Sequence, residues 1–381
     1  MINKRNNRRR RGAVLVLAAV MMVAMFALLA LAVDLGYVTL VRTELQSSAD
    51  AAALAATWEL YDSRALLPES TPYAAQSDVF NAAQYYASRN TVAQAAPELA
   101  FTDFEYGRLD PASSMNFIFN KDDPSYFNAV RVRVRRTADI NGEVPLFFAR
   151  VVGVDSNSGE AEAIAMFRDN FSGFTMPPLD KGNLKVLPFA LDINTWQAVL
   201  AGITPDLWSW DADNKQIYPW PDGVPEANLF PQGTGSPGNR GTVDVGASNN
   251  STADIRRQIL QGVSQADLDH IGGKLELGPD GTLELNGDTG ISAGMKDALA
   301  SIKGKPRVIP LFATVVGPGN NATYTIVGFA GVRIMDVNLT GQMSSKRVII
   351  QPAKVKIHGG IPAPDDAPRS YNIYSPVWLV R

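Results

Sequence analysis

The 381-residue sequence predicts an α+β protein, in which an N-terminal transmembrane helix continues into a long helix packed on a small antiparallel sheet, and a strand-rich α+β C-terminal domain follows. Three observations support this prediction. An uninterrupted apolar run lies near the N-terminus, a helical repeat of apolar residues follows it directly, and segments with the alternation of strands occupy much of the remaining chain.

The composition excludes several classes of protein. Apolar residues make up 46% and charged residues 19%, which is typical of folded domains and excludes a disordered chain or a multi-span membrane protein. Six of the 35 basic residues lie in residues 1–11, so the rest of the chain carries 29 basic and 38 acidic residues. That acidic excess disfavours nucleic acid as a partner. Because the chain has no cysteine, disulfides and thiolate chemistry are excluded.

Residues 13–33 form an apolar run without a charged side chain. A helix of this length spans about 31 Å, close to the hydrocarbon thickness of a bilayer. Asp34 follows the run at its outer edge, and the basic arm of residues 1–12 precedes it. Because basic segments stay on the cytoplasmic side, we predict a single-pass protein of the bacterial inner (cytoplasmic) membrane, with a cytoplasmic N-terminus and a periplasmic C-terminal domain.

Two kinds of processing compete with a retained anchor. Cleavage after Ala32 would use the small residues at Ala30 and Ala32, although the apolar run is longer than that of a secretory signal peptide. Prepilin processing after Gly12 requires an acid at the fifth mature position, which is Leu17 here. The sequence favours a retained helix and leaves cleavage after Ala32 open.

The residues behind the apolar run predict that the same helix continues. Apolar positions recur every three or four residues from Leu35 to Leu60, and no glycine or proline interrupts residues 37–67. Small residues in this stripe let another backbone approach closely. The stripe either packs on the chain's own sheet, which we favour, or contacts a partner helix. The candidate residues for a partner-helix contact are Leu45, Ala49, Ala52, Ala53 and Ala56.

The N-terminal region resembles that of TadE/TadG-like proteins, which belong to the Tad (tight adherence) machinery that builds Flp pili. The order and spacing of a basic arm, an apolar span and an alanine-rich helix support the resemblance. A second stretch, residues 130–167, is also similar to this family. The residues that match in the first stretch are Arg11, Gly12, Asp34, Gly36, Leu45, Gln46, Ala49, Asp50, Ala51, Ala52, Ala53 and Leu54.

The resemblance implies a pilin-like plan and a membrane-anchored component of Flp pilus assembly or secretion. Some TadG-like proteins also carry a metal-binding adhesion domain with an Asp-x-Ser-x-Ser loop. The nearest match, at Asp123, has Phe127 at its last position, so this metal site is not carried over.

One strand is clearly predicted within the pilin-like region. Residues 129–136 alternate strictly, with valines on one face and Arg131, Arg133 and Arg135 on the other. The basic face either binds an acidic lipid or polysaccharide or is the solvated side of an antiparallel strand, which we favour.

Turn-rich residues 169–183 separate two domains. We predict a pilin-like ectodomain over 34–170, a C-terminal α+β domain over 183–358 and an exposed, proline-rich tail over 359–381. Within the second domain, strands are expected at 307–316, 323–335 and 347–357, and a hairpin is expected at 275–285 around Gly278 and Gly281.

A tryptophan-rich stretch suggests a second function. Flat aromatic rings can stack on sugars, so an envelope glycan-binding or adhesive protein is the alternative to pilus assembly. The candidate glycan contacts are Trp196, Trp208, Trp210 and Trp220.

No constellation of residues predicts catalysis. The two histidines, His270 and His358, lack a nucleophile motif, and Asp211 opens a sequence that misses the glycine and glutamate of a calcium loop. We therefore expect a structural or interaction protein with no catalytic residue, cofactor or metal. Its expected partners are the inner membrane, other Tad or pilus-assembly proteins, a second copy of itself or cell-envelope glycan, and not nucleic acid.

Overall fold

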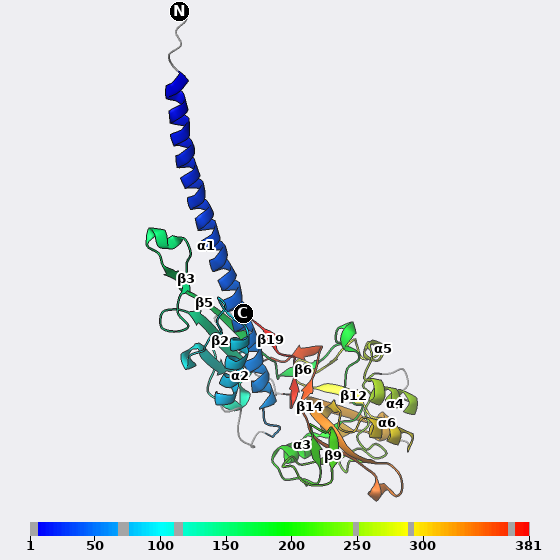
Figure 1. The fold of residues 1–381 in the computed structure, drawn as a ribbon. Helices are drawn as coiled ribbons and strands as arrows, with labels where there is room; N and C mark the ends of the chain where they lie inside the picture. Colours follow the sequence, from blue (N-terminus) through cyan, green and yellow to red (C-terminus); the bar gives the residue numbers. More distant parts are fainter. Residues whose placement is uncertain are drawn as a thin grey trace, which may run out of the picture.

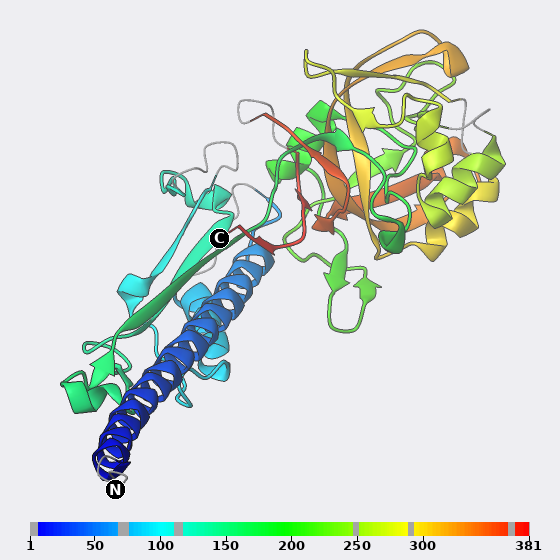
Figure 2. The ribbon, with the colours of Figure 1, turned by 90° about the horizontal axis from the view of Figure 1, so that it is seen from above.

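The computed structural model describes residues 7–67, 76–109, 117–246, 251–288, 293–364 and 370–380. Helix α1 (Asn7–Asp62) extends well beyond the rest of the described chain, as Figure 1 shows. An N-terminal domain packs along the second half of α1, and a second domain lies beyond the end of the helix (Figure 2). The predicted mixed α+β class, with a long apolar helix followed by several sheets, is confirmed.

The N-terminal domain is a four-stranded antiparallel sheet covered by two helices. Its strand order is β1 (Phe104–Gly107), β2 (Ala129–Arg136), β5 (Gly159–Met166) and β19 (Trp378–Leu379). Helix α1 packs on this sheet, and α2 (Gln76–Arg89) packs against α1. The predicted strand at 129–136 matches β2, and its valines are fully buried against α1.

The C-terminal domain is built around a six-stranded mixed sheet. Its strands follow the order β10 (Ala227–Phe230), β15 (Arg347–Pro352), β14 (Thr323–Asn338), β13 (Pro306–Val316) and β7 (Leu191–Asp192), and β12 (Leu283–Asn286) also pairs with β14. Helices α3 (Ile193–Leu200), α4 (Thr252–Gln261) and α6 (Lys296–Ser301) supply apolar side chains to a core with β13, β14 and β15. The short helix α5 (Gln265–Asp269) contributes Leu268 to a second core.

The two cores lie on opposite faces of the sheet. Ile309 and Leu311 of β13 contact the first core, whereas Val308 and Phe312 contact the second. Side chains of neighbouring strand residues point to opposite faces, so this division explains why β13 is apolar over most of its length. The predicted C-terminal strands are confirmed, and the third is divided into β15 and β16 (Val355–Lys356).

Four small sheets complete the fold. A three-stranded sheet has the order β11 (Leu275–Glu276), β6 (Phe171–Phe174) and β17 (Gly360–Pro362). Strand β16 pairs in parallel with β18 (Ile373–Tyr374), while β3 (Val144–Pro145) pairs with β4 (Ser156–Asn157). Strand β8 (Ser209–Asp211) pairs with β9 (Gln216–Tyr218).

The hairpin predicted at 275–285 is wrong. A turn does form, with the Gly281 N–H donating to the Gly278 carbonyl at 2.9 Å. However, β11 pairs with β6 and β12 pairs with β14, so the two flanking strands join different sheets. The turn residues determine the reversal of the chain, but pairing with distant strands determines which sheet each flanking strand joins.

The exposed tail predicted from residue 359 is also wrong for the residues that the structure describes. β17 pairs with β6, β18 pairs with β16, and β19 completes the N-terminal sheet by pairing with β5. Ile373 and Tyr374 are buried. The C-terminal segment therefore runs back from the second domain to the first and connects them.

Candidate membrane-interface site

Helix α1 has two parts with opposite surroundings. From Val14 to Val33 its large apolar side chains are exposed, whereas from Val41 onward one face lies in the core of the N-terminal domain. Among the described residues, α1 is the one helix that is long enough and apolar enough to cross a membrane. Water would solvate the exposed part poorly, so a hydrocarbon environment suits it.

Asp34 marks the boundary between these two parts. Its carboxylate accepts hydrogen bonds from the backbone N–H groups of Phe147, Phe148 and Ala149, at 2.9, 3.0 and 2.7 Å. Only 4% of this residue is exposed. Burial opposes ionisation, but the three N–H donors and Arg150 outweigh it and lower the pKa of Asp34 below its ordinary value. A charged Asp34 therefore fixes a distant loop beside the end of the apolar run.

The segment held by Asp34 is the β3–β4 loop (residues 146–155), which contains a short 3-10 helix, Ala149–Val152. This loop lies at the end of the N-terminal domain nearest the free part of α1 (Figure 1). Val151 and Val152 are 88% and 80% exposed. The other large apolar side chains exposed on it are those of Phe147, Phe148 and Val154.

Contacts with α1 define the orientation of the loop. The Phe147 ring meets the Tyr37 ring edge to face, with centroids 5.1 Å apart. At the base of the loop, Leu146 donates its N–H to the Asp155 carbonyl at 3.0 Å. The exposed apolar residues of the loop and of α1 thus form one apolar region around Asp34. Aromatic and apolar groups in such a position suit the interface of a bilayer.

The residues proposed for a partner-helix contact lie elsewhere on α1 and are not available to a partner. Leu45, Ala49, Ala52, Ala53 and Ala56 are each 0% exposed and belong to the core between α1, α2 and the sheet. This burial supports the favoured interpretation, packing on the chain's own sheet, over a contact with a partner helix.

The basic face of β2 is neutralised by its neighbours. Arg135 pairs with Asp103 at 2.8 Å, and Arg133 pairs with Glu162 of β5 at 3.3 Å. Arg131 forms ion pairs with Glu105 of β1 and with Glu162. Cross-strand acids thus satisfy these arginines, which supports the favoured interpretation of a solvated strand face over a ligand site.

The four tryptophans do not form one exposed patch. Trp196 is 1% exposed and packs in the core of the second domain, so it cannot contact glycan. Arg333 lies over the Trp210 ring at 4.3 Å, and Lys303 lies over the Trp208 ring at 5.9 Å. Trp220 is exposed, and its ring stacks on Tyr218 with centroids 4.5 Å apart.

Polar groups elsewhere form turns rather than metal sites. Asp211 accepts hydrogen bonds from the N–H groups of Asp213 and Asn214, both at 2.9 Å, as in an ordinary polar turn. No group of three or more His, Asp or Glu side chains able to hold a metal was found among the described residues. His270 follows α5 on the surface, far in sequence from His358.

Sequence reasoning placed Asp34 at the membrane edge but did not find the β3–β4 loop as its partner. A signal was present, because residues 146–154 are almost entirely apolar yet lie between two short strands rather than within one. An apolar run in a loop is unusual for a surface that faces water.

Within the described residues, α1 is apolar enough in its first part to cross a membrane and packs in its second part on an antiparallel sheet, which defines the class as an α+β protein with a candidate membrane-spanning helix. Two family models match this part of the chain. Residues 12–76 match the putative Flp pilus-assembly TadE/G-like family, and residues 51–165 match the putative Tad-like Flp pilus-assembly family. The resemblance found in the sequence is therefore confirmed, and the region 12–165 is Tad-like. No curated protein and no solved structure matches the chain.

Proposed function

We propose that this protein is a component of Flp pilus assembly or secretion that is anchored in the inner membrane and acts outside it. The observation that carries the proposal is the match of residues 12–165 to two pilus-assembly families, which coincides with the free apolar helix and the sheet domain. The proposed role is structural: α1 fixes the protein in the membrane, and the ectodomain presents surfaces to other assembly proteins. No residue is assigned a catalytic function.

The β3–β4 loop supports the membrane part of this proposal. Its exposed Phe147, Phe148, Val151 and Val152 would enter the lipid interface next to Asp34, giving the domain a second contact with the bilayer. Two contacts restrict the tilt of the domain, whereas a single helix alone leaves it free to rotate. In this proposal the N-terminus is cytoplasmic, because the basic arm precedes the apolar run.

Deletion of the gene in the source organism, followed by complementation, tests the proposal. We expect loss of Flp pili on deletion and recovery with the full chain. A chain in which an unrelated cleavable signal replaces residues 1–33 would be exported without an anchor, and we expect it not to restore pili. Normal piliation in the deletion strain would contradict the proposal.

Glycan binding is the alternative function. Its remaining structural support is the exposed, stacked pair of Tyr218 and Trp220 on the β8–β9 hairpin. Retention of the full chain on a peptidoglycan column, lost in Trp220→Ala and kept in the core-facing control Trp196→Phe, would favour this alternative.

A further inference from the structure

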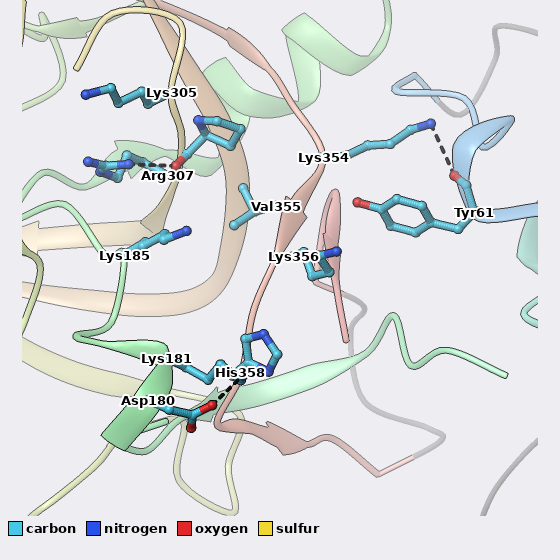
Figure 3. A pocket seen from close by; sticks show the side chains of 11 residues that line it. Tyr61, Asp180, Lys181, Lys185, Lys305, Arg307, Lys354, Val355, Lys356 and His358 are labelled. Carbon is cyan, nitrogen blue, oxygen red and sulfur yellow. Dashed lines mark hydrogen bonds and ion pairs between the residues drawn. The ribbon is translucent and has the colours of Figure 1, made fainter. Parts of the chain in front are cut away.

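A basic groove lies where the end of α1 meets the C-terminal domain. Its volume is about 720 Å³, which is in the range of ligand-binding sites. Figure 3 shows its basic side chains, which come from separate segments of the second domain. The six lysine and arginine residues that line it are Lys181, Lys185, Lys305, Arg307, Lys354 and Lys356.

The cations of this groove are largely unneutralised. Lys181 pairs with Asp180 at 2.7 Å, and the other five have no carboxylate within 4 Å among the residues that the structure describes. Arg307 donates to the carbonyl of Pro306 at 3.0 Å. In β2, by contrast, acids pair with Arg131, Arg133 and Arg135.

Two of the cations are also attached to α1. The Lys354 Nζ donates to the carbonyls of Tyr61 and Asp62 at 3.2 and 2.6 Å, at the C-terminal end of the helix (Figure 3). The Lys356 Nζ lies over the Trp58 ring, 4.4 Å from its centroid. A cation at this end of a helix is favourable. The groove therefore joins the anchored helix to the second domain.

Burial is the main cause of the pKa shifts of the groups that line the groove. Burial lowers the pKa of Arg307, and it lowers the pKa of Lys354 to about 8. Burial, followed by Lys181 and Lys356, lowers the pKa of His358. Each shift means that burial disfavours the charged form of the group, and a carboxylate beside it would stabilise that form.

We propose that this groove binds an acidic segment of a partner polypeptide. The cations are spread around an open space instead of converging on one point, which suits carboxylates spaced along a peptide. Pro306, which is half-buried, lies among them and offers apolar contact to a peptide side chain between two carboxylates. A phosphate site would instead be expected to gather backbone N–H groups or the fork of several arginines.

The distance from the bilayer argues against a lipid headgroup of the anchoring membrane. At about 1.5 Å per residue, the helix between Asp34 and Tyr61 is roughly 40 Å long. The groove lies at the far end of this helix from the apolar run. The inference rests on the proposed function for the existence of a protein partner, and it adds the chemistry by which that partner is held.

Fluorescence anisotropy with the detergent-solubilised full chain tests the inference. The probe is a labelled peptide of alternating glutamate and alanine, and its matched control has glutamine in place of glutamate. We expect saturable binding of the glutamate peptide that weakens as salt is raised. In the double variant Lys185→Gln and Arg307→Gln, the dissociation constant should rise about tenfold.

The control variant removes the same charge elsewhere. Arg256→Gln combined with Lys346→Gln lies outside the groove and should change the dissociation constant by less than about twofold. An equal loss in both double variants, or equal binding of the glutamine peptide, would overturn the inference. Binding of tripolyphosphate without binding of the peptide would overturn it in favour of a phosphate ligand. Unchanged thermal unfolding in the groove variant excludes misfolding, and a negative result leaves the pilus-assembly test unaffected.

Discussion

Asp34 illustrates how one charged residue can organise a junction. Its carboxylate receives three backbone N–H groups from the β3–β4 loop, and loss of the carboxylate would leave these donors unsatisfied. We therefore predict that Asp34→Ala frees the loop, detected as faster hydrogen exchange of the amides of residues 147–149.

Asp78→Asn, on the exposed surface of α2, is the matched control and should leave the exchange of these amides unchanged. Equal exchange in Asp34→Ala and the wild type would show that the carboxylate does not hold the loop.

Glu226 gives a second prediction at this scale. Burial, followed by the nearby Asp206 and Asp222, raises its pKa from 4.5 to about 7, although the Leu207 and Trp208 N–H groups oppose the rise. The folded state therefore binds a proton that the unfolded state releases between these pH values. Its contribution to stability is present below about pH 4.5 and is lost as pH rises through about 7.

In Glu226→Gln this part of the pH dependence should disappear. The measurement is the free energy of unfolding of the solubilised chain between pH 4.5 and 7.5, with exposed Glu284→Gln as the control. If the difference between Glu226→Gln and the wild type is the same at every pH, the assigned titration is wrong.

At the scale of elements, α1 combines an exposed apolar part and a core-facing part in one continuous helix. Ala52 is fully buried in the core beside α2 and the sheet, so a larger side chain would overpack it. We predict that Ala52→Leu destabilises the ectodomain by about 1–3 kcal/mol. Thermal unfolding measures this loss, and Ser47→Leu on the exposed side of the same helix should show little of it.

This pair of variants also separates the two interpretations of the alanine-rich stripe. Normal stability of Ala52→Leu together with lost pilus assembly would indicate a partner helix and contradict the packing described here.

The β3–β4 loop can be tested directly because the chain has no cysteine. A polarity-sensitive fluorophore attached in Val152→Cys should shift to shorter wavelength and be quenched by brominated lipids in nanodiscs. The same label in Gln261→Cys, at the exposed end of α4, should not respond. Identical responses at both positions would mean that the loop does not meet the bilayer.

Sequence patterns predicted elements well where local periodicity decides the structure. The apolar run, the stripe on α1 and the alternation in β2 each follow from the repeat of a helix or strand. The predictions failed where contacts between distant segments determine the structure. The partners of β11 and β12, the return of β19 to the first sheet, and the loop held by Asp34 depend on contacts between residues more than 35 positions apart.

The candidate sites show the same difference between what local patterns predict and what long-range contacts determine. The sequence identified the cations of β2 because they alternate, but the structure pairs them with acids of neighbouring strands. The basic groove draws its lysines from segments at 181–185, 305–307 and 354–356, and no local pattern relates these segments. Likewise, tryptophans close in sequence are separated by burial, because Trp196 faces the core of its domain while Trp220 lies on a hairpin.

On the scale of the whole molecule, the segment that connects the two domains is held against the first domain near the end of α1. Asp169 pairs with Arg64 at 2.8 Å and with Arg108 at 3.3 Å, and both Asp169 and Arg64 are almost fully buried. Removing the shared acid leaves cations without their counter-charge, which costs about 3 kcal/mol or more. We predict that Asp169→Asn lowers the unfolding temperature and makes the connection between the domains easier to cleave by protease.

The exposed pair Lys181–Asp180 serves as the control for this prediction, because Asp180→Asn should have little effect on either measurement. Unchanged protease resistance in Asp169→Asn would show that the ion pairs do not hold the connecting segment.

The central claim is that α1 holds the ectodomain outside the inner membrane. Labelling of single-cysteine variants in intact spheroplasts with a membrane-impermeant maleimide tests it most directly. Gln261→Cys should be labelled without lysis, Asn3→Cys should be labelled only after lysis, and both proteins should remain with the membranes after alkaline extraction. Recovery of the full-length chain from the soluble cytosol, or labelling of position 261 only after lysis, would contradict the account.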